Sequence, residues 1–135
     1  MDRRELLVGA GALALASIAR GAPPAKAAAA PSLADAASEC ERKAEACLTH
    51  CLMMFGSGDT SMAACAAAVR ETLATSHALA TLAAANSKHA KELAQVCKAV
   101  CKDCEAECRK HEAKMPVCKE CADACAKMIA AIDKA

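Results

Sequence analysis

Apolar side chains recur every three or four positions from Leu33 to the end of the chain, and Lys and Glu occupy most of the positions between them. This spacing predicts amphipathic α-helices, because steps of three and four return to the same helical face. No segment shows the alternation of apolar and polar residues that marks a half-buried strand. Turn-forming residues interrupt the pattern three times. We therefore expect four helices, at about residues 33–55, 61–85, 88–113 and 116–134.

Several helix ends carry start signals. Ser32 followed three residues later by Asp35 predicts an N-cap. Asp59 or Ser61 can cap the second helix, and Pro116 suits a first helical position, where its missing N–H costs nothing. The links between the helices are short, which favours an all-α, antiparallel up-down-up-down four-helix bundle over residues 31–135.

Composition shows that such a bundle has an unusual interior. The chain has 135 residues, enough for one domain. Phe55 is the only aromatic residue, and much of the 56% hydrophobic content is alanine and cysteine. We therefore expect something besides side-chain packing to stiffen the core. The net charge of +1 and the lack of aromatic stacking residues argue against nucleic-acid binding.

Residues 1–30 have a different character from the rest of the chain. Arg3-Arg4 stands directly before the short apolar run Leu6–Ile18, and small residues follow at Ala25–Ala30. The run is too short to span a bilayer comfortably. The pattern resembles a twin-arginine export signal, so we expect residues 1–30 to be cleaved and the mature protein to be periplasmic or in an equivalent extracytoplasmic compartment, without a membrane span. A retained membrane anchor is the alternative.

Eleven cysteines lie on the apolar stripes of the expected helices. Their steps along each helix are three, four or seven residues, so the cysteines of one helix share a face. In an antiparallel bundle, all the cysteine-bearing regions meet near the Gly56–Asp59 and Met115-Pro116 breaks. We therefore expect a cysteine-lined core at that end. The cysteines are Cys40, Cys47, Cys51, Cys65, Cys97, Cys101, Cys104, Cys108, Cys118, Cys121 and Cys125.

So many thiols allow several chemistries. Disulfides suit an exported protein, but eleven is an odd number, and Cβ atoms at i and i+4 are about 5–6 Å apart, too far for a disulfide within one helix. A disulfide-braced structural or interaction protein with links between helices remains an alternative. Zinc sites need four ligands in a closed tetrahedron, and iron–sulfur clusters usually use a compact cysteine run. Eleven thiols in a continuous row over four helices fit neither kind of site. Reduced cysteines packed as small hydrophobes are the simplest alternative.

Cu(I) suits the pattern better, because it is soft and prefers thiolate and thioether sulfur. If each Cu(I) replaces one thiol proton, the buried charge is unchanged and many ions can be accommodated. Two thiolates at i and i+4, such as Cys104 and Cys108, could clamp one ion. Met54, Met62 and His50 lie near the same end and are candidates for the mouth of a copper site.

The motifs resemble those of bacterial copper storage proteins, the cysteine-rich four-helix-bundle family that binds Cu(I). The resemblance rests on CxxxxxxCLxHC at Cys40–Cys51, the Met-rich loop leading to Ser61-Met62-Ala63-Ala64-Cys65, and the final CKECADAC. It is strongest with the exported, twin-arginine members. It implies storage of multiple Cu(I) ions per chain for later supply to copper enzymes, commonly in a homotetramer. It also implies that all eleven cysteines are metal ligands and that His50, Met54 and Met62 line the mouth.

The sequence also departs from the family pattern. Ser76, Met128 and Ile132 stand where relatives have cysteine, and Ser57 stands where relatives have methionine, so we expect a lower capacity. A copper detoxification or delivery protein with the same ligands is a further alternative. We do not expect an enzyme, because nothing pairs a nucleophile with a base or leaves an open catalytic metal site.

Overall fold

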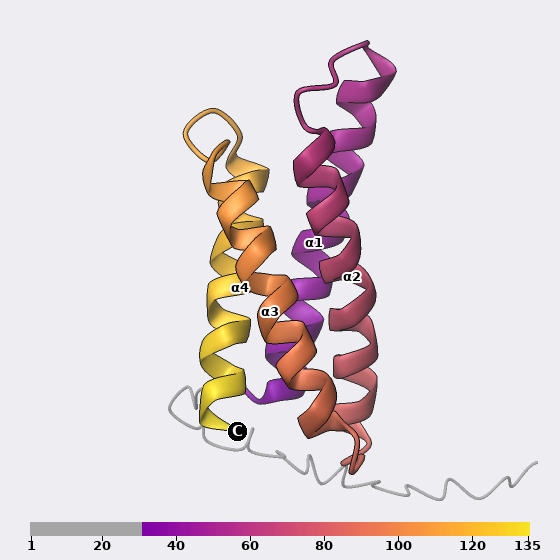
Figure 1. The fold of residues 1–135 in the computed structure, drawn as a ribbon, viewed down its shortest axis with the longest axis vertical. Helices are drawn as coiled ribbons and strands as arrows, with labels where there is room; N and C mark the ends of the chain where they lie inside the picture. Colours follow the sequence, from indigo (N-terminus) through magenta and orange to yellow (C-terminus); the bar gives the residue numbers. More distant parts are fainter. Residues whose placement is uncertain (1–30) are drawn as a thin grey trace, which may run out of the picture.

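In the computed structural model, which describes residues 31–135, four helices run antiparallel and no strand is present in that part of the chain (Figure 1). Each helix packs against two neighbours, in the cyclic order α1, α2, α3, α4 and back to α1. This arrangement confirms the predicted four-helix bundle. The helices are α1 (Leu33–Gly56), α2 (Ala63–Ala84), α3 (Ala90–Arg109) and α4 (Pro116–Lys134).

The start of α1 follows its sequence signal. The Ser32 hydroxyl accepts a hydrogen bond from the Asp35 backbone N–H at 3.1 Å. The Asp35 carboxylate accepts one from the Ser32 backbone N–H at 3.2 Å, which completes a capping box. The predicted N-cap is confirmed.

The start of α2 differs from expectation. Its N-cap is Met62, which provides no side-chain cap, so the prediction that Asp59 or Ser61 caps this helix was wrong. Asp59 instead accepts a hydrogen bond from the Ser61 backbone N–H at 2.9 Å within the preceding turn. Gly58 has a φ of 84°, a left-handed conformation that glycine adopts without strain. The turn uses these residues, and α2 therefore begins two positions later than expected.

α3 ends at Arg109, four residues before the expected end. The backbone N–H groups of Lys110 and His111 bond to carbonyls three residues back, at 3.2 and 3.0 Å, so the helix tightens into turns there. Met115 is extended, with φ −130° and ψ 98°, as the residue before a proline tends to be. Pro116 occupies the first turn of α4, as predicted. The chain needs this extra length to reverse direction before the proline.

The two ends of the bundle differ in their connections. The loops at residues 57–62 and 110–115 lie at one end, called here the loop end, and residues 85–89 form the turn between α2 and α3 at the opposite end, the turn end (Figure 1). Asn86 has a φ of 51° in this turn, a conformation that asparagine tolerates. The molecule is thus two hairpins, α1–α2 and α3–α4, and the chain connects them only at the turn end.

The expected export signal lies in residues 1–30, outside the described residues, and stays a prediction. Among residues 31–135, no helix combines the length and apolar character needed to cross a membrane.

Candidate metal centre

The cysteines form the centre of the core. All eleven lie within the described residues, all are fully buried, and all are free thiols. They share the interior with small residues such as Ala37 and Ala44, which let the helices approach closely. The predicted cysteine-lined core is therefore present, with sulfur contributed by every helix.

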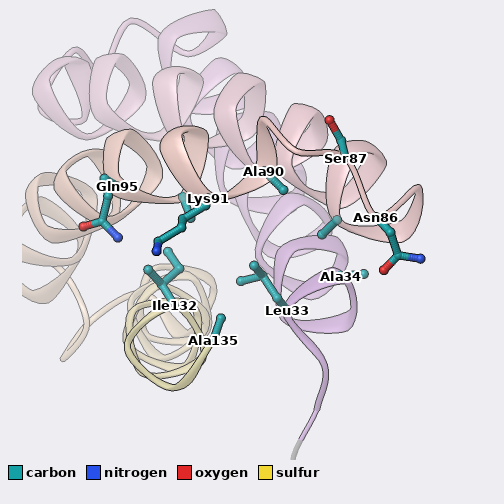
Figure 2. Close-up of a pocket in the computed structure, with 11 residues that line it drawn as sticks. Leu33, Ala34, Asn86, Ser87, Ala90, Lys91, Gln95, Ile132 and Ala135 are labelled. Atoms are coloured by element: carbon teal, nitrogen blue, oxygen red, sulfur yellow. The ribbon is translucent and has the colours of Figure 1, made fainter.

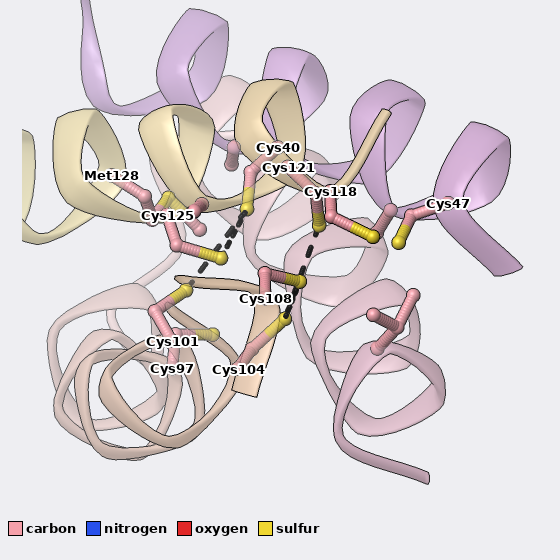
Figure 3. Packing of buried hydrophobic residues seen from close by; sticks show 14 of the residues in the cluster. Cys40, Cys47, Cys97, Cys101, Cys104, Cys108, Cys118, Cys121, Cys125 and Met128 are labelled. Atoms are coloured by element: carbon pink, nitrogen blue, oxygen red, sulfur yellow. Dashed lines mark hydrogen bonds between the residues drawn. The ribbon is translucent and has the colours of Figure 1, made fainter. Parts of the chain in front are cut away.

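The sulfur atoms lie close together across the helices. Cys65 and Cys108 are 3.7 Å apart between their Sγ atoms, and Cys104 and Cys121 are 3.9 Å apart. Figure 3 shows the second of these pairs together with Cys40, whose Sγ lies 4.0 Å from the Sγ of a cysteine on α3 and of another on α4. A metal–thiolate bond of about 2.3 Å lets one ion bridge sulfurs up to about 4.6 Å apart. Each of these pairs is therefore close enough to share an ion.

Nine of the cysteines assemble into four groups of three whose Sγ atoms all lie within 4.8 Å of one another. Each group shares one cysteine with the next, so the four groups form a continuous chain, called here the sulfur column. The shared residues are Cys47, Cys121 and Cys125. The groups, in order from the loop end, are Cys47-Cys65-Cys118, Cys47-Cys108-Cys121, Cys104-Cys121-Cys125 and Cys40-Cys101-Cys125.

Most of these groups combine cysteines from different helices. Three of the four draw on three helices each, and three of the four join the two hairpins. Pairs along one helix also occur, since Cys104 and Cys108 lie 4.0 Å apart between sulfurs. Cys51 and Cys97 belong to none of the four groups. The Cys97 thiol instead donates to the Thr75 carbonyl oxygen at 3.2 Å.

Burial and mutual hydrogen bonding give the thiols very different acidities. Hydrogen bonds from the Cys101 and Cys125 thiols lower the pKa of Cys40 to about 4. Cys47 and Cys104 also have lowered pKa values, because each accepts hydrogen bonds from neighbouring thiols. Burial raises the pKa of Cys51 to about 11. The three favoured thiolates lie in different groups of the column, so each has neutral S–H donors around it.

The remaining thiols are harder to ionise. Burial and the neighbouring Cys47 raise the pKa of Cys118 to about 12. The pKa is also raised in Cys65, Cys97, Cys101, Cys108, Cys121 and Cys125. Most of the column is therefore protonated at neutral pH, and a metal ion that binds there must displace protons.

The three predicted mouth residues lie near the loop end with different degrees of burial. Met62 is fully buried beside the start of α2, and Met54 is half-buried and packs against the core. His50 is half-buried, and its Nε2 atom is buried without a hydrogen-bond partner. Two sulfurs and an unpaired imidazole nitrogen thus lie beside the loop end of the sulfur column.

Two buried polar residues of the centre were not identified as candidate site residues from the sequence. Thr72 and Ser76 on α2 are fully buried, and neither hydroxyl has a hydrogen-bond partner. A signal was present, because both fall on the same helical face as Cys65 and Val69, where the other buried residues are apolar or cysteine. A polar residue on an otherwise apolar stripe deserves a search for its partner.

The turn end contains a different kind of space. A cavity of about 520 Å³ lies there, shown in Figure 2 between the ends of the helices. Its lining includes Leu33, Ile132, Asn86 and Lys91, and no cysteine. Leu79 and Met128, which are fully buried in the core, do not line this cavity either. This cavity is therefore separate from the sulfur column.

Comparison with protein families matches residues 26–135 to the family described as copper storage protein. A comparison with curated proteins finds no match. The matched region includes all four helices and all eleven cysteines. Soft, closely spaced thiols in a closed interior are the donor set expected of a copper-binding protein. The family match and the clustered thiols agree, and the chain belongs to the copper storage protein family.

Proposed function

We propose that this protein stores multiple Cu(I) ions along the sulfur column. The observation that carries the proposal is the continuity of the column, in which neighbouring groups of three thiols share Cys47, Cys121 or Cys125. A shared thiolate can bridge two ions, so the groups form a row in place of separate sites. Cu(I) is the oxidation state that fits, because it prefers soft sulfur ligands.

Loading exchanges protons for metal. Each Cu(I) forms a bond to sulfur, the displaced thiol proton leaves to solvent, and no oxidation state changes. With about one ion for each thiol, the loaded interior carries no net charge, and burial remains tolerable. The proposal includes no catalytic step.

We place the mouth of the store at the loop end. Met54 and Met62 offer thioethers, which bind Cu(I) without losing a proton. The buried, unpaired Nε2 atom of His50 offers a third ligand atom there. Ions would pass from these weaker ligands to Cys51 and then to the thiolates of the column.

The wider setting is also a proposal. Arg3-Arg4 and the apolar run after it support export by the twin-arginine pathway to the periplasm or an equivalent compartment. The resemblance supports a homo-oligomer, specifically a tetramer, and a copper-requiring enzyme as recipient. Metal and thiol analysis of protein recovered from its own compartment tests whether the store is loaded there.

The deciding experiment is an anaerobic titration of the reduced protein with Cu(I) in the presence of a chromophoric Cu(I) chelator. We expect about one ion to bind per thiol before the coloured Cu(I)–chelator complex begins to form. Protein with alkylated thiols is the control and should bind almost none. Saturation at one or two ions would contradict the proposal.

Two measurements address the alternatives. Mass spectrometry of the native protein tests for a disulfide-braced protein, for which five disulfides and no metal are expected. Release of Cu(I) to a competing chelator separates storage from detoxification or delivery. Slow release over hours supports storage, whereas release within seconds favours delivery.

A further inference from the structure

Nine of the eleven thiols divide into three separate sets in which no cysteine is used twice. The Sγ atom of Cys104 lies 4.0 Å from that of Cys108 and 3.9 Å from that of Cys121, and the last two lie within 4.8 Å of each other. These three cysteines therefore form a set, and two of the groups already described account for the other six. The sets are Cys47-Cys65-Cys118, called here the loop-end set, Cys104-Cys108-Cys121, the middle set, and Cys40-Cys101-Cys125, the turn-side set.

Each set is a compact triangle of sulfur atoms. In the turn-side set, the Sγ atom of Cys40 lies 4.0 Å from those of Cys101 and Cys125, and the third side of the triangle is within 4.8 Å (Figure 3). A central atom with three bonds to sulfur of about 2.3 Å in one plane would hold the sulfurs about 4.0 Å apart. A pyramidal atom needs them slightly closer, which small rotations of the thiol side chains provide. The three sulfurs of a set can therefore all bond to one atom.

The charge of the interior favours a trivalent guest over a divalent one in such a set. Among residues 31–135, no acidic or basic side chain is fully buried, so nothing there compensates an added charge. A structural Zn²⁺ ion takes a fourth ligand, and with three thiolates alone it would leave a net negative charge, which burial makes costly. Trivalent arsenic forms three bonds to sulfur and gives an uncharged product. Its valence and its charge both match three converging thiols.

We propose that the loop-end, middle and turn-side sets are binding sites for trivalent arsenic, supplied as arsenous acid. The inference goes beyond Cu(I) storage and does not depend on it, although the same thiols serve both. Arsenous acid, As(OH)₃, is uncharged near neutral pH, so its transfer into the interior avoids the cost of burying a charge.

The binding step balances without any other reactant. In each set, three S–H bonds and three As–O bonds break, and three As–S bonds form. The three thiol protons leave with the three hydroxide groups as three molecules of water. Arsenic stays trivalent, and no electron is transferred. The thiols of the protein are free, as this step requires.

Two cysteines fall outside the three sets. Cys51 and Cys97 belong to no group of three sulfurs, and the Cys97 thiol donates to the Thr75 carbonyl oxygen at 3.2 Å. We therefore expect three arsenic atoms per chain, held by nine thiols, and no contribution from these two cysteines.

Three double variants test this assignment, because each keeps nine thiols but a different number of complete sets. Cys51→Ser/Cys97→Ser leaves all three sets intact, and we expect three arsenic atoms. Cys104→Ser/Cys108→Ser removes both cysteines from the middle set, and we expect two. In Cys101→Ser/Cys118→Ser, every remaining group of three includes Cys121, so we expect one.

The measurement uses the full chain, residues 1–135, reduced and incubated with excess arsenite under anaerobic conditions. Native mass spectrometry counts the arsenic atoms bound, and circular dichroism of the empty proteins checks that each variant is helical. If a double variant loses its helical signal, the single variants Cys101→Ser and Cys97→Ser replace it. These two cysteines are fully buried on the same helix, and we expect two and three arsenic atoms respectively.

Equal arsenic counts in the three double variants would overturn the inference, because the number of thiols alone predicts that result. Fewer than three arsenic atoms in the wild type would overturn it as well. A Cu(I) titration of the wild type separates this inference from the proposed function. About one Cu(I) per thiol with fewer than three arsenic atoms would remove the inference alone. Three arsenic atoms with only one or two Cu(I) ions would remove the proposed storage and leave the inference standing.

Discussion

The cysteines of the protein differ in the number of three-sulfur groups to which they belong. Cys47, Cys121 and Cys125 each belong to two groups of three sulfurs. Cys97 belongs to none, and its thiol is already bonded to a backbone carbonyl. The eleven thiols, equal in type and in burial, are therefore unequal in the number of ions they can bridge.

Replacing a shared cysteine should cost more capacity than replacing an unshared one. We expect Cys47→Ser to lower the number of bound Cu(I) ions by about two, because two groups lose a ligand. Cys97→Ser is the matched control, and we expect a loss of at most about one ion. Chelator competition under anaerobic conditions measures both. Equal losses in the two variants would show that sharing does not govern capacity.

At the same scale, the sequence predicts which residues face the core, but it does not predict which sulfur atoms lie close together. Steps of three and four place each cysteine on the right face of its own helix, and all eleven are buried as expected. The partners of Cys47 on three other helices depend on the rotation and height of each helix, which packing determines. The burial of Thr72 and Ser76 follows from the same periodicity, but the lack of a partner for their hydroxyls depends on packing.

At the scale of the element, local signals work where a side chain caps the helix. Ser32 and Asp35 form the expected capping box, and Pro116 begins α4. The signals fail where turn geometry competes, because Asp59 serves the turn before α2 and the chain leaves α3 at Arg109 to reach Pro116. Helix number and direction were predictable from periodicity, but three boundaries were not: the starts of α2 and α3, each two residues later than expected, and the end of α3.

The N-cap of α1 provides a test of these local contributions. We expect Ser32→Ala to lower the free energy of unfolding by about 1 kcal/mol. For a domain of this size, that corresponds to a melting temperature lower by about 4–8 °C. Ser38→Ala is the control, because Ser38 is exposed within α1 and alanine favours a helix. Thermal unfolding of the empty protein followed by circular dichroism measures both variants. Equal melting temperatures for the wild type and Ser32→Ala would rule out a stabilising cap.

At the scale of the whole molecule, the stability of the empty bundle is linked to the protonation of its interior. Eight thiols have pKa values raised above the ordinary 9.0, among them Cys51 at about 11 and Cys118 at about 12. In the unfolded chain these thiols ionise near pH 9, while in the bundle they stay protonated. Their contribution to stability is therefore complete below pH 9 and is lost as the pH rises through the folded values. Cys40, with a pKa lowered to about 4, acts in the opposite sense and stabilises the bundle most above pH 9.

We accordingly expect the reduced empty protein to lose at least about 5 °C in melting temperature between pH 9 and pH 11, because the raised thiols outnumber the lowered ones. The Cu(I)-loaded protein is the control, since it has the same lysines and surface ion pairs but no thiol protons in the column. Its melting temperature should change much less over this range. A parallel decline in both forms would assign the effect to the surface charges.

The two hairpins are joined by the chain only through residues 85–89, at the end away from the loops. Among the ion pairs of residues 31–135, Lys43 with Glu120, at 2.5 Å, is the one that crosses from one hairpin to the other. Away from that turn, the two hairpins are held together by the packing of α1 against α4 and of α2 against α3. Under the proposed storage function, each Cu(I) bound between Cys47 and a cysteine of α3 or α4 would add a cross-link between the hairpins. Loading would therefore join the two hairpins at several points near the loop end, where the chain itself does not connect them, and removal of the copper would leave only their packing contacts.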